Sequence, residues 1–147
     1  MSEANKAVVT RWFEEVWSGG KLDQIESLLD PQCVGHGLEK KDGCEIEGAE
    51  EHRRFIGQLR QAIPDLGFGM DDLIAEGDRV SVRLTMRGTH VGDELGVPAS
   101  HAGILVAGLA LFKVSEGKIC VAWYGLNWLN FYQQLGAAEV DSRLGLA

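Results

Sequence analysis

The feature that most constrains the fold is a strict alternation of apolar and polar residues between Arg79 and Arg87. Its apolar positions are Val80, Val82, Leu84 and Met86. Because successive side chains of a β-strand point to opposite faces, this pattern predicts a strand with one buried and one hydrated face. The buried face needs a second layer to cover it.

Two later runs are apolar at nearly every position, over residues 104–112 and 119–128, and the turn signal Glu116-Gly117 separates them. Strands of this kind are usually covered on both faces. We expect helices to cover one face. On the other, either the sheet curls around a pocket or a second subunit packs against it, and the sequence leaves both possibilities open.

The N-terminal half predicts three helices, since its apolar residues recur at steps of three and four. These segments cover residues 8–17, 22–29 and 49–63. Gly19-Gly20, Pro31 and Pro64 mark their ends. A brief strand is predicted over 33–36 and a loop over 37–48. Helices followed by a meander of long strands indicate the α+β class.

Composition limits the classes of protein that the chain can belong to. Its 147 residues, 45% of them hydrophobic and 24% charged, suit one globular domain over residues 1–147, with a core from about 4 to 136 and a short C-terminal tail. A net charge of −8 disfavours nucleic acid and membrane surfaces as partners. Without a signal peptide or a long apolar span, a cytoplasmic protein is expected.

The cysteines and histidines suggest neither a metal site nor a disulfide. Cys33, Cys44 and Cys120 are odd in number and far apart, so we interpret them as free thiols. The four histidines show none of the spacings typical of zinc ligands. We therefore expect no metal and no cofactor.

Several short motifs resemble, in their order and spacing, the SnoaL-like polyketide cyclases of the nuclear-transport-factor-2-like superfamily. They are Pro64-Asp65-Leu66, residues 75–80, residues 87–92, Gly96-Val97-Pro98, and Gly117-Lys118-Ile119 followed by Trp123. The resemblance covers nearly the whole chain. It implies a cone of curved antiparallel sheet with three N-terminal-half helices over an apolar pocket, and a homodimer formed sheet to sheet.

The resemblance also implies a function. It favours a cofactor-independent enzyme of lyase or isomerase type, which cyclises or isomerises a hydrophobic carbonyl compound, such as a polycyclic one, in secondary metabolism or antibiotic biosynthesis. The same fold also hosts epoxide hydrolases, hydratases and non-catalytic ligand-binding modules, and these stay open as alternatives. The family's aspartate after the Gly-Lys-Ile turn corresponds to Tyr124, and relatives carry Glu at Val121 and Asp at Asn127.

Three residues are the catalytic candidates. His90 matches the family's histidine and continues the apolar face of the strand before it, where an imidazole could transfer a proton. Tyr124 could donate a hydrogen bond to a developing enolate. Asn127 could hold a substrate oxygen. The competing interpretations are a hydrogen-bonded core histidine, a core tyrosine and a helix cap.

Further residues are candidates for binding the substrate: Trp12, Trp17, His36, Phe55, Asp65, Met86, His101 and Trp123. The aromatic side chains among them suit a planar ligand and a plain core equally well. Asp65 is as well explained as a turn residue, and His101, in a glycine-containing loop, as an exposed histidine.

Overall fold

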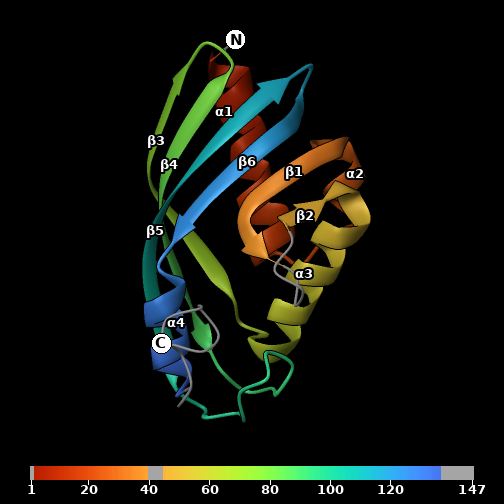
Figure 1. Cartoon of the computed structure of the whole chain (residues 1–147). Coiled ribbons are helices and arrows are strands. Elements are labelled where there is room, and N and C mark those ends of the chain that lie inside the picture. Colours follow the sequence, from red (N-terminus) through yellow and green to blue (C-terminus); the bar gives the residue numbers. More distant parts are fainter. Residues whose placement is uncertain (1, 40–44, 137–147) are drawn as a thin grey trace.

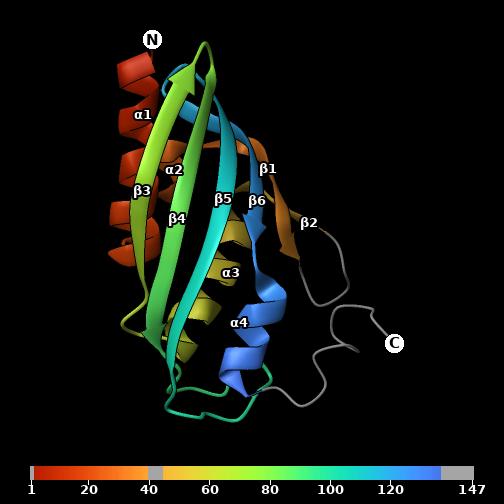
Figure 2. The same cartoon turned by 90° about the vertical axis from the view of Figure 1, so that its left-hand side faces the viewer.

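The protein forms a curved six-stranded sheet that does not close on itself, with helices packed against one side (Figures 1 and 2). The structure is a computed structural model, and it describes residues 2–39 and 45–136. This architecture confirms the predicted α+β class and the predicted cover of helices.

The first predicted helix is longer than expected, because α1 continues directly into the wider π-helical stretch η1. The helical elements are α1 (Ser2–Arg11), η1 (Trp12–Ser18), η2 (Leu22–Gln24), α2 (Ile25–Leu28), α3 (Gly48–Ala62) and α4 (Trp128–Leu135). Helix α4 was missed, and the strand predicted to reach residue 128 ends at Leu126. The apolar run continues across this boundary, so apolar content alone could not locate it.

The sheet order is β2-β1-β6-β5-β4-β3. Its strands are β1 (Leu29–Glu39), β2 (Glu45–Glu47), β3 (Gly67–Glu76), β4 (Arg79–Thr89), β5 (Gly103–Ser115) and β6 (Lys118–Leu126). Neighbours are antiparallel except β1 and β6, so the prediction of a wholly antiparallel sheet was wrong at that pair. β1 reaches β6 only through a long connection, which permits either direction.

The alternation in β4 has the predicted effect. Val80, Val82, Leu84 and Met86 are at most 1% exposed, whereas Arg79, Arg83 and Arg87 lie on the outer face. β5 differs from the prediction, because only one of its faces is buried within the chain. Ile104, Val106, Ala110 and Phe112 point inward, and Leu105 and Leu109 are 61% and 59% exposed on the outside.

Aromatic residues fill the space between η1 and the sheet. The Phe13 ring contacts Phe68 and Phe112, with centroids 5.3 and 5.6 Å away. Arg60 of α3 fixes the end of η1, since its guanidinium donates hydrogen bonds to the carbonyls of Trp17 and Ser18, at 2.9 Å each. The helices therefore hold the η1 aromatics over the inner face of the sheet.

Candidate active site

Tyr124 lies on the inner face of β6 and is 7% exposed. Its hydroxyl oxygen accepts a hydrogen bond of 2.9 Å from the indole Nε1–H of Trp12. Burial raises the pKa of the phenol, and the nearby N–H groups of Trp12 and Trp17 offset only part of this rise. Tyr124 therefore keeps its proton at neutral pH and can act as a hydrogen-bond donor, not as a base.

A second donor lies beside Tyr124. The Trp17 ring is centred 5.8 Å from the Tyr124 ring, and its buried Nε1–H has no hydrogen-bond partner among residues 2–39 and 45–136. The Phe55 ring packs against Trp17, and the Phe112 ring packs against Tyr124. Because buried N–H groups are almost always satisfied, an unpaired indole next to a phenol marks a place where a polar ligand atom would be stabilised.

His90 directly follows β4 and is completely buried, as expected for a side chain on the same face as Met86. Its backbone pairs with Ala102 and His101. The Nδ1 atom lies 3.1 Å from Oγ of Ser100 and accepts from the Ser100 N–H at 3.4 Å. An accepting Nδ1 places the proton of a neutral ring on Nε2, which is buried and lacks a partner in the described part of the chain.

Comparison with known proteins gives the family. The sequence profile of the SnoaL-like polyketide cyclases matches residues 7–135. The chain belongs to this family. Aklanonic acid methyl ester cyclase DnrD from Streptomyces peucetius is 24% identical over 130 residues, covering 87% of this chain and 88% of DnrD.

Two solved structures share the fold of this SnoaL-like chain. A SnoaL-like protein from Jannaschia sp. CCS1 matches with a TM-score of 0.80 and 26% identity, covering 92% of this chain and 94% of its own. TsrD from Streptomyces laurentii matches with a TM-score of 0.78 and 25% identity, covering 92% and 96%. Together with the family, these relatives support a cyclase-type function and a small hydrophobic substrate.

Asn127 has a structural role in this family member. Its side-chain oxygen accepts the backbone N–H of Asn130 at 3.0 Å, so it caps the N-terminus of α4, and it is exposed. The competing interpretation of Asn127 as a helix cap therefore describes its observed contact.

His36 and Trp123 were expected near the pocket, but they lie on the outer face of the sheet. Their rings stack at 5.7 Å, and the Arg79 guanidinium lies 5.5 Å from the Trp123 ring centre. His36 also pairs with Glu45. Trp123 is one residue from Tyr124, so a strand that buries one must expose the other.

Two further candidates lie away from the aromatic interior. Asp65 is exposed, and its carboxylate accepts from the N–H and hydroxyl of Thr89 at 2.7 and 2.8 Å, which supports the turn interpretation. His101 is exposed as well, and its φ of +58° places it in a loop. Trp12, Trp17, Phe55 and Met86, by contrast, all belong to the interior or pack against it.

Sequence analysis gave no role to His52, yet it is completely buried. Its ring packs edge-on against the Trp12 ring with centroids 6.0 Å apart, and its Nδ1 lies 2.7 Å from the Gly48 carbonyl oxygen. The burial of His52 could have been predicted from helical spacing. His52 precedes Ile56 by four and Leu59 by seven positions, which places all three on the apolar face of α3.

The remaining sequence predictions concern thiols and metals. Cys33 and Cys120 are free thiols, as predicted, and Cys44 lies outside the described residues. Burial raises the pKa of Cys33 to about 12. Within the described ranges no three His, Cys, Asp or Glu side chains are grouped to hold a metal, and no helix there is both long and apolar enough to cross a membrane.

Proposed function

We propose that this chain is a cofactor-independent enzyme that uses acid–base chemistry to cyclise or isomerise a hydrophobic, polyketide-like carbonyl compound in secondary metabolism. The observation that carries the proposal is the protonated Tyr124 hydroxyl, held by Trp12 in a buried aromatic interior at the position to which the resemblance assigns the family's aspartate. An apolar interior favours binding of a planar substrate, and an enolate oxygen there requires hydrogen-bond donors.

In this proposal the substrate oxygen lies between the Tyr124 O–H and the Trp17 N–H. Both donors are fixed by packing before the substrate arrives, and such preorganised donors stabilise charge most effectively where water is excluded. His90 is not assigned a part at this oxygen, because it lies eight residues along β4 from Val82, the residue level with Tyr124 across β5. Asn127 is not assigned a part in the reaction, because it caps α4 and its side chain is exposed outside the aromatic interior.

A non-catalytic binding module is the second candidate. It is favoured by the resemblance to the family, which assigns carboxylates to positions 121, 124 and 127, where this chain has Val121, Tyr124 and Asn127. An epoxide hydrolase or hydratase is disfavoured, because the arginines of β4 lie on the outer face of the sheet, where an interior carboxylate could not pair with them.

The test of this function is Tyr124→Phe, assayed first with aklanonic acid methyl ester, the compound in the name of the relative DnrD. The substitution removes one oxygen. Loss of an oxyanion-type hydrogen bond lowers turnover about a hundredfold, or about 2.7 kcal/mol. Loss of a merely structural hydroxyl bond costs about 1 kcal/mol of stability with little change in turnover.

Tyr132→Phe is the matched control, since it removes the same atom from a half-buried residue of α4. Paired measurements of melting temperature and turnover separate the two outcomes. Unchanged turnover with lowered stability in Tyr124→Phe would contradict the enzymatic proposal and support the binding module.

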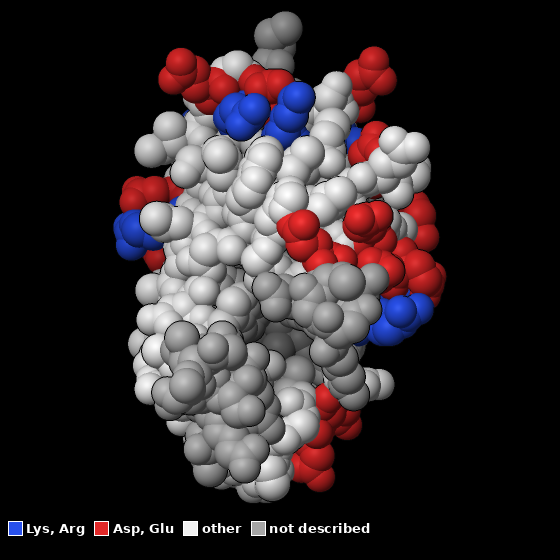
Figure 3. All heavy atoms as spheres, viewed as in Figure 1, with Lys and Arg blue, Asp and Glu red and all other residues white. Residues whose placement is uncertain are grey.

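We also propose that the protein forms a homodimer through the outer face of the sheet. Leu105, Leu109 and Trp123 expose large apolar side chains there. Figure 3 shows an uncharged area over β5 and β6, with acidic side chains gathered toward the ends and edges of this view. Exposed large apolar side chains on one face of a sheet are typical of protein interfaces.

A further inference from the structure

We propose that His52 is the proton acceptor of the interior site, a role that no carboxylate among residues 2–39 and 45–136 is placed to fill. The inference rests on the proposed function, because it supplies the base that the chemistry at Tyr124 requires. It is carried by the position of His52, by the hydrogen bond that orients its ring, and by the unpaired nitrogen that this orientation leaves.

His52 and Tyr124 contact the same residue, Trp12. The Trp12 ring packs against His52, and its N–H donates to the Tyr124 hydroxyl. The strand register also brings Gly35, the residue that His52 packs against, close to Tyr124. Gly35 of β1 pairs with Ala122 of β6, which precedes Tyr124 by two residues on the same inner face.

Gly35 borders the free nitrogen of His52. A Cβ atom at Gly35 would lie only 2.9 Å from the Nε2 atom of His52, so any larger residue would displace the imidazole. The His52 ring thus lies against the inner face of β1, one strand away from Tyr124.

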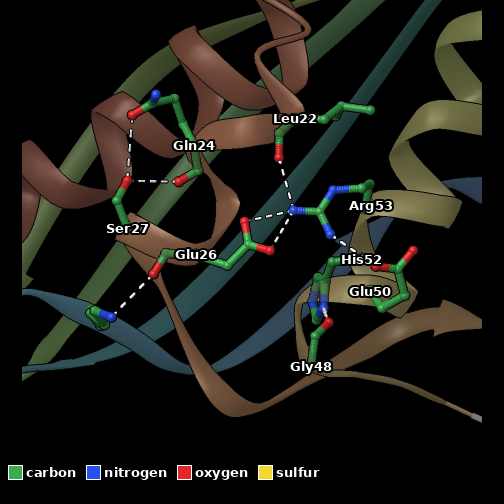
Figure 4. A network of polar contacts seen from close by, with 9 residues as sticks. Leu22, Gln24, Glu26, Ser27, Gly48, Glu50, His52 and Arg53 are labelled. Carbon is green, nitrogen blue, oxygen red and sulfur yellow. Dashed lines mark hydrogen bonds and ion pairs between the residues drawn. The ribbon is translucent and has the colours of Figure 1, made fainter.

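The backbone of α3 fixes which nitrogen of His52 carries the proton. Its Nδ1 lies 2.7 Å from the Gly48 carbonyl oxygen, which can only accept (Figure 4). Nδ1 therefore donates, and Nε2 of the neutral ring presents a lone pair. His90 has the opposite arrangement, since its Nδ1 accepts from Ser100 and its Nε2 donates. One buried histidine is thus oriented as an acceptor and the other as a donor.

The neighbouring residue holds this end of α3 in place. Arg53 donates to the Leu22 carbonyl at 3.3 Å and to the Glu26 carboxylate at 2.6 Å, and it also pairs with Glu50 (Figure 4). Because side chains one position apart point in different directions on a helix, Arg53 anchors α3 from outside while His52 points inward.

The environment keeps His52 neutral. Burial lowers its pKa, although the hydrogen bond to Gly48 and the charge of Glu51 oppose the change. The Nε2 atom is buried and has no hydrogen-bond partner among the described residues. A neutral imidazole with an unpaired, desolvated lone pair can accept a proton at neutral pH.

The proposed step balances within the site. Nε2 of His52 removes a proton from the carbon next to a substrate carbonyl. The electron pair of that C–H bond forms the enolate, whose negative oxygen accepts from Tyr124 and Trp17. After the enolate carbon has attacked a second carbonyl, the imidazolium returns its proton to the new alkoxide, so that His52 ends the cycle neutral.

The base can be tested with the probe 5-nitrobenzisoxazole, without the natural substrate. A base removes its ring C–H proton, the C–H electrons form a nitrile, and the N–O bond breaks to release a coloured phenolate. We expect the wild-type protein to accelerate this elimination. His52→Asn should reduce the acceleration about a hundredfold, because the asparagine amide can still donate to Gly48 but offers no acceptor at the Nε2 position.

Arg54→Ala, an exposed change on the same helix, should leave the rate unchanged. Wild-type rate in His52→Asn, or no acceleration by the wild-type protein, would overturn the proposal. A second measurement needs no variant: nitrogen-15 NMR of the wild-type protein should show His52 protonated on Nδ1, and protonation on Nε2 would also overturn it. The two proposals can fail separately. If His52→Asn slows elimination of 5-nitrobenzisoxazole while Tyr124→Phe leaves turnover of aklanonic acid methyl ester unchanged, the proposed function fails and the assignment of His52 as a base stands.

Discussion

Strand β6 has two faces that differ in almost every respect, and two neighbouring aromatic residues show it. Tyr124 is 7% exposed, contacts other aromatic rings and receives a hydrogen bond from Trp12. Trp123 is 36% exposed, stacks with the ring of His36 and lies 5.5 Å from the guanidinium of Arg79. The inner face is therefore buried and holds an ordered polar contact, whereas the outer face leaves a large aromatic side chain open to solvent.

Two histidines near β1 show the same contrast between the buried inner face and the exposed outer face. His36 lies on the outer face and pairs with Glu45, whereas His52 reaches the inner face from α3. Both carry an imidazole close to the same strand, yet only His52 is desolvated and leaves a nitrogen unpaired. Burial, more than residue type, thus separates the candidate for proton transfer from a surface residue.

The largest expected effect is on the free energy of unfolding, when a side chain is truncated on the inner or on the outer face of the sheet. Phe112 is completely buried on the inner face of β5, so Phe112→Ala should destabilise the fold by about 3–5 kcal/mol. Ile74, 66% exposed, is the control, and Ile74→Ala should change stability by less than about 1 kcal/mol. Urea unfolding measures both, and equal losses would contradict the division into an inner core and an outer surface.

A smaller effect is expected on assembly. Leu109→Lys places a charge in the centre of the exposed apolar surface, where burial in an interface would cost several kcal/mol. Light scattering should give the mass of a dimer for the wild-type protein and of a single chain for this variant, with an unchanged circular dichroism spectrum. A wild-type protein that is monomeric at micromolar concentration would refute the proposed dimer.

The smallest effect concerns the thiols of two adjacent strands. With its pKa raised to about 12, Cys33 is a thiolate in only about one molecule in ten thousand at pH 8. Iodoacetamide followed by peptide mapping should therefore modify Cys120, which is partly exposed, well before Cys33. Urea-unfolded protein is the control, in which both should react at similar rates. Faster labelling of Cys33 in the folded protein would contradict its burial.

Period-two alternation allowed the sequence to predict β4 and the burial of His90, because one uninterrupted pattern sets the direction of every side chain. The position of Tyr124 followed from the same rule applied to Ala122 and Leu126, which are buried with it, whereas Cys120 lies beyond a register shift and is only partly buried. His36 was harder, because its strand pairs irregularly with β6 between Leu29 and Val34, and register there depends on tertiary contacts.

Other parts of the site could not be predicted from local patterns. The β6–α4 boundary falls within a continuous apolar run, so nothing before Asn127 marks the end of the strand. His52 was treated as one of several dispersed histidines, although its spacing to Ile56 was available. Its orientation depends on its bond to Gly48 and its contact with Trp12, and only the latter requires the tertiary fold.

The central claim is that a carbonyl ligand binds at the inner aromatic cluster and not on the outer face. The most direct measurement follows the indole N–H signals of the tryptophans by NMR while 1-tetralone, a bicyclic aromatic ketone, is added. We expect the Trp17 signal to move most, the Trp12 signal to follow and the Trp123 signal to stay unchanged, because of these three only Trp17 and Trp12 contact Tyr124. A shift of Trp123 with Trp17 unmoved would contradict the claim.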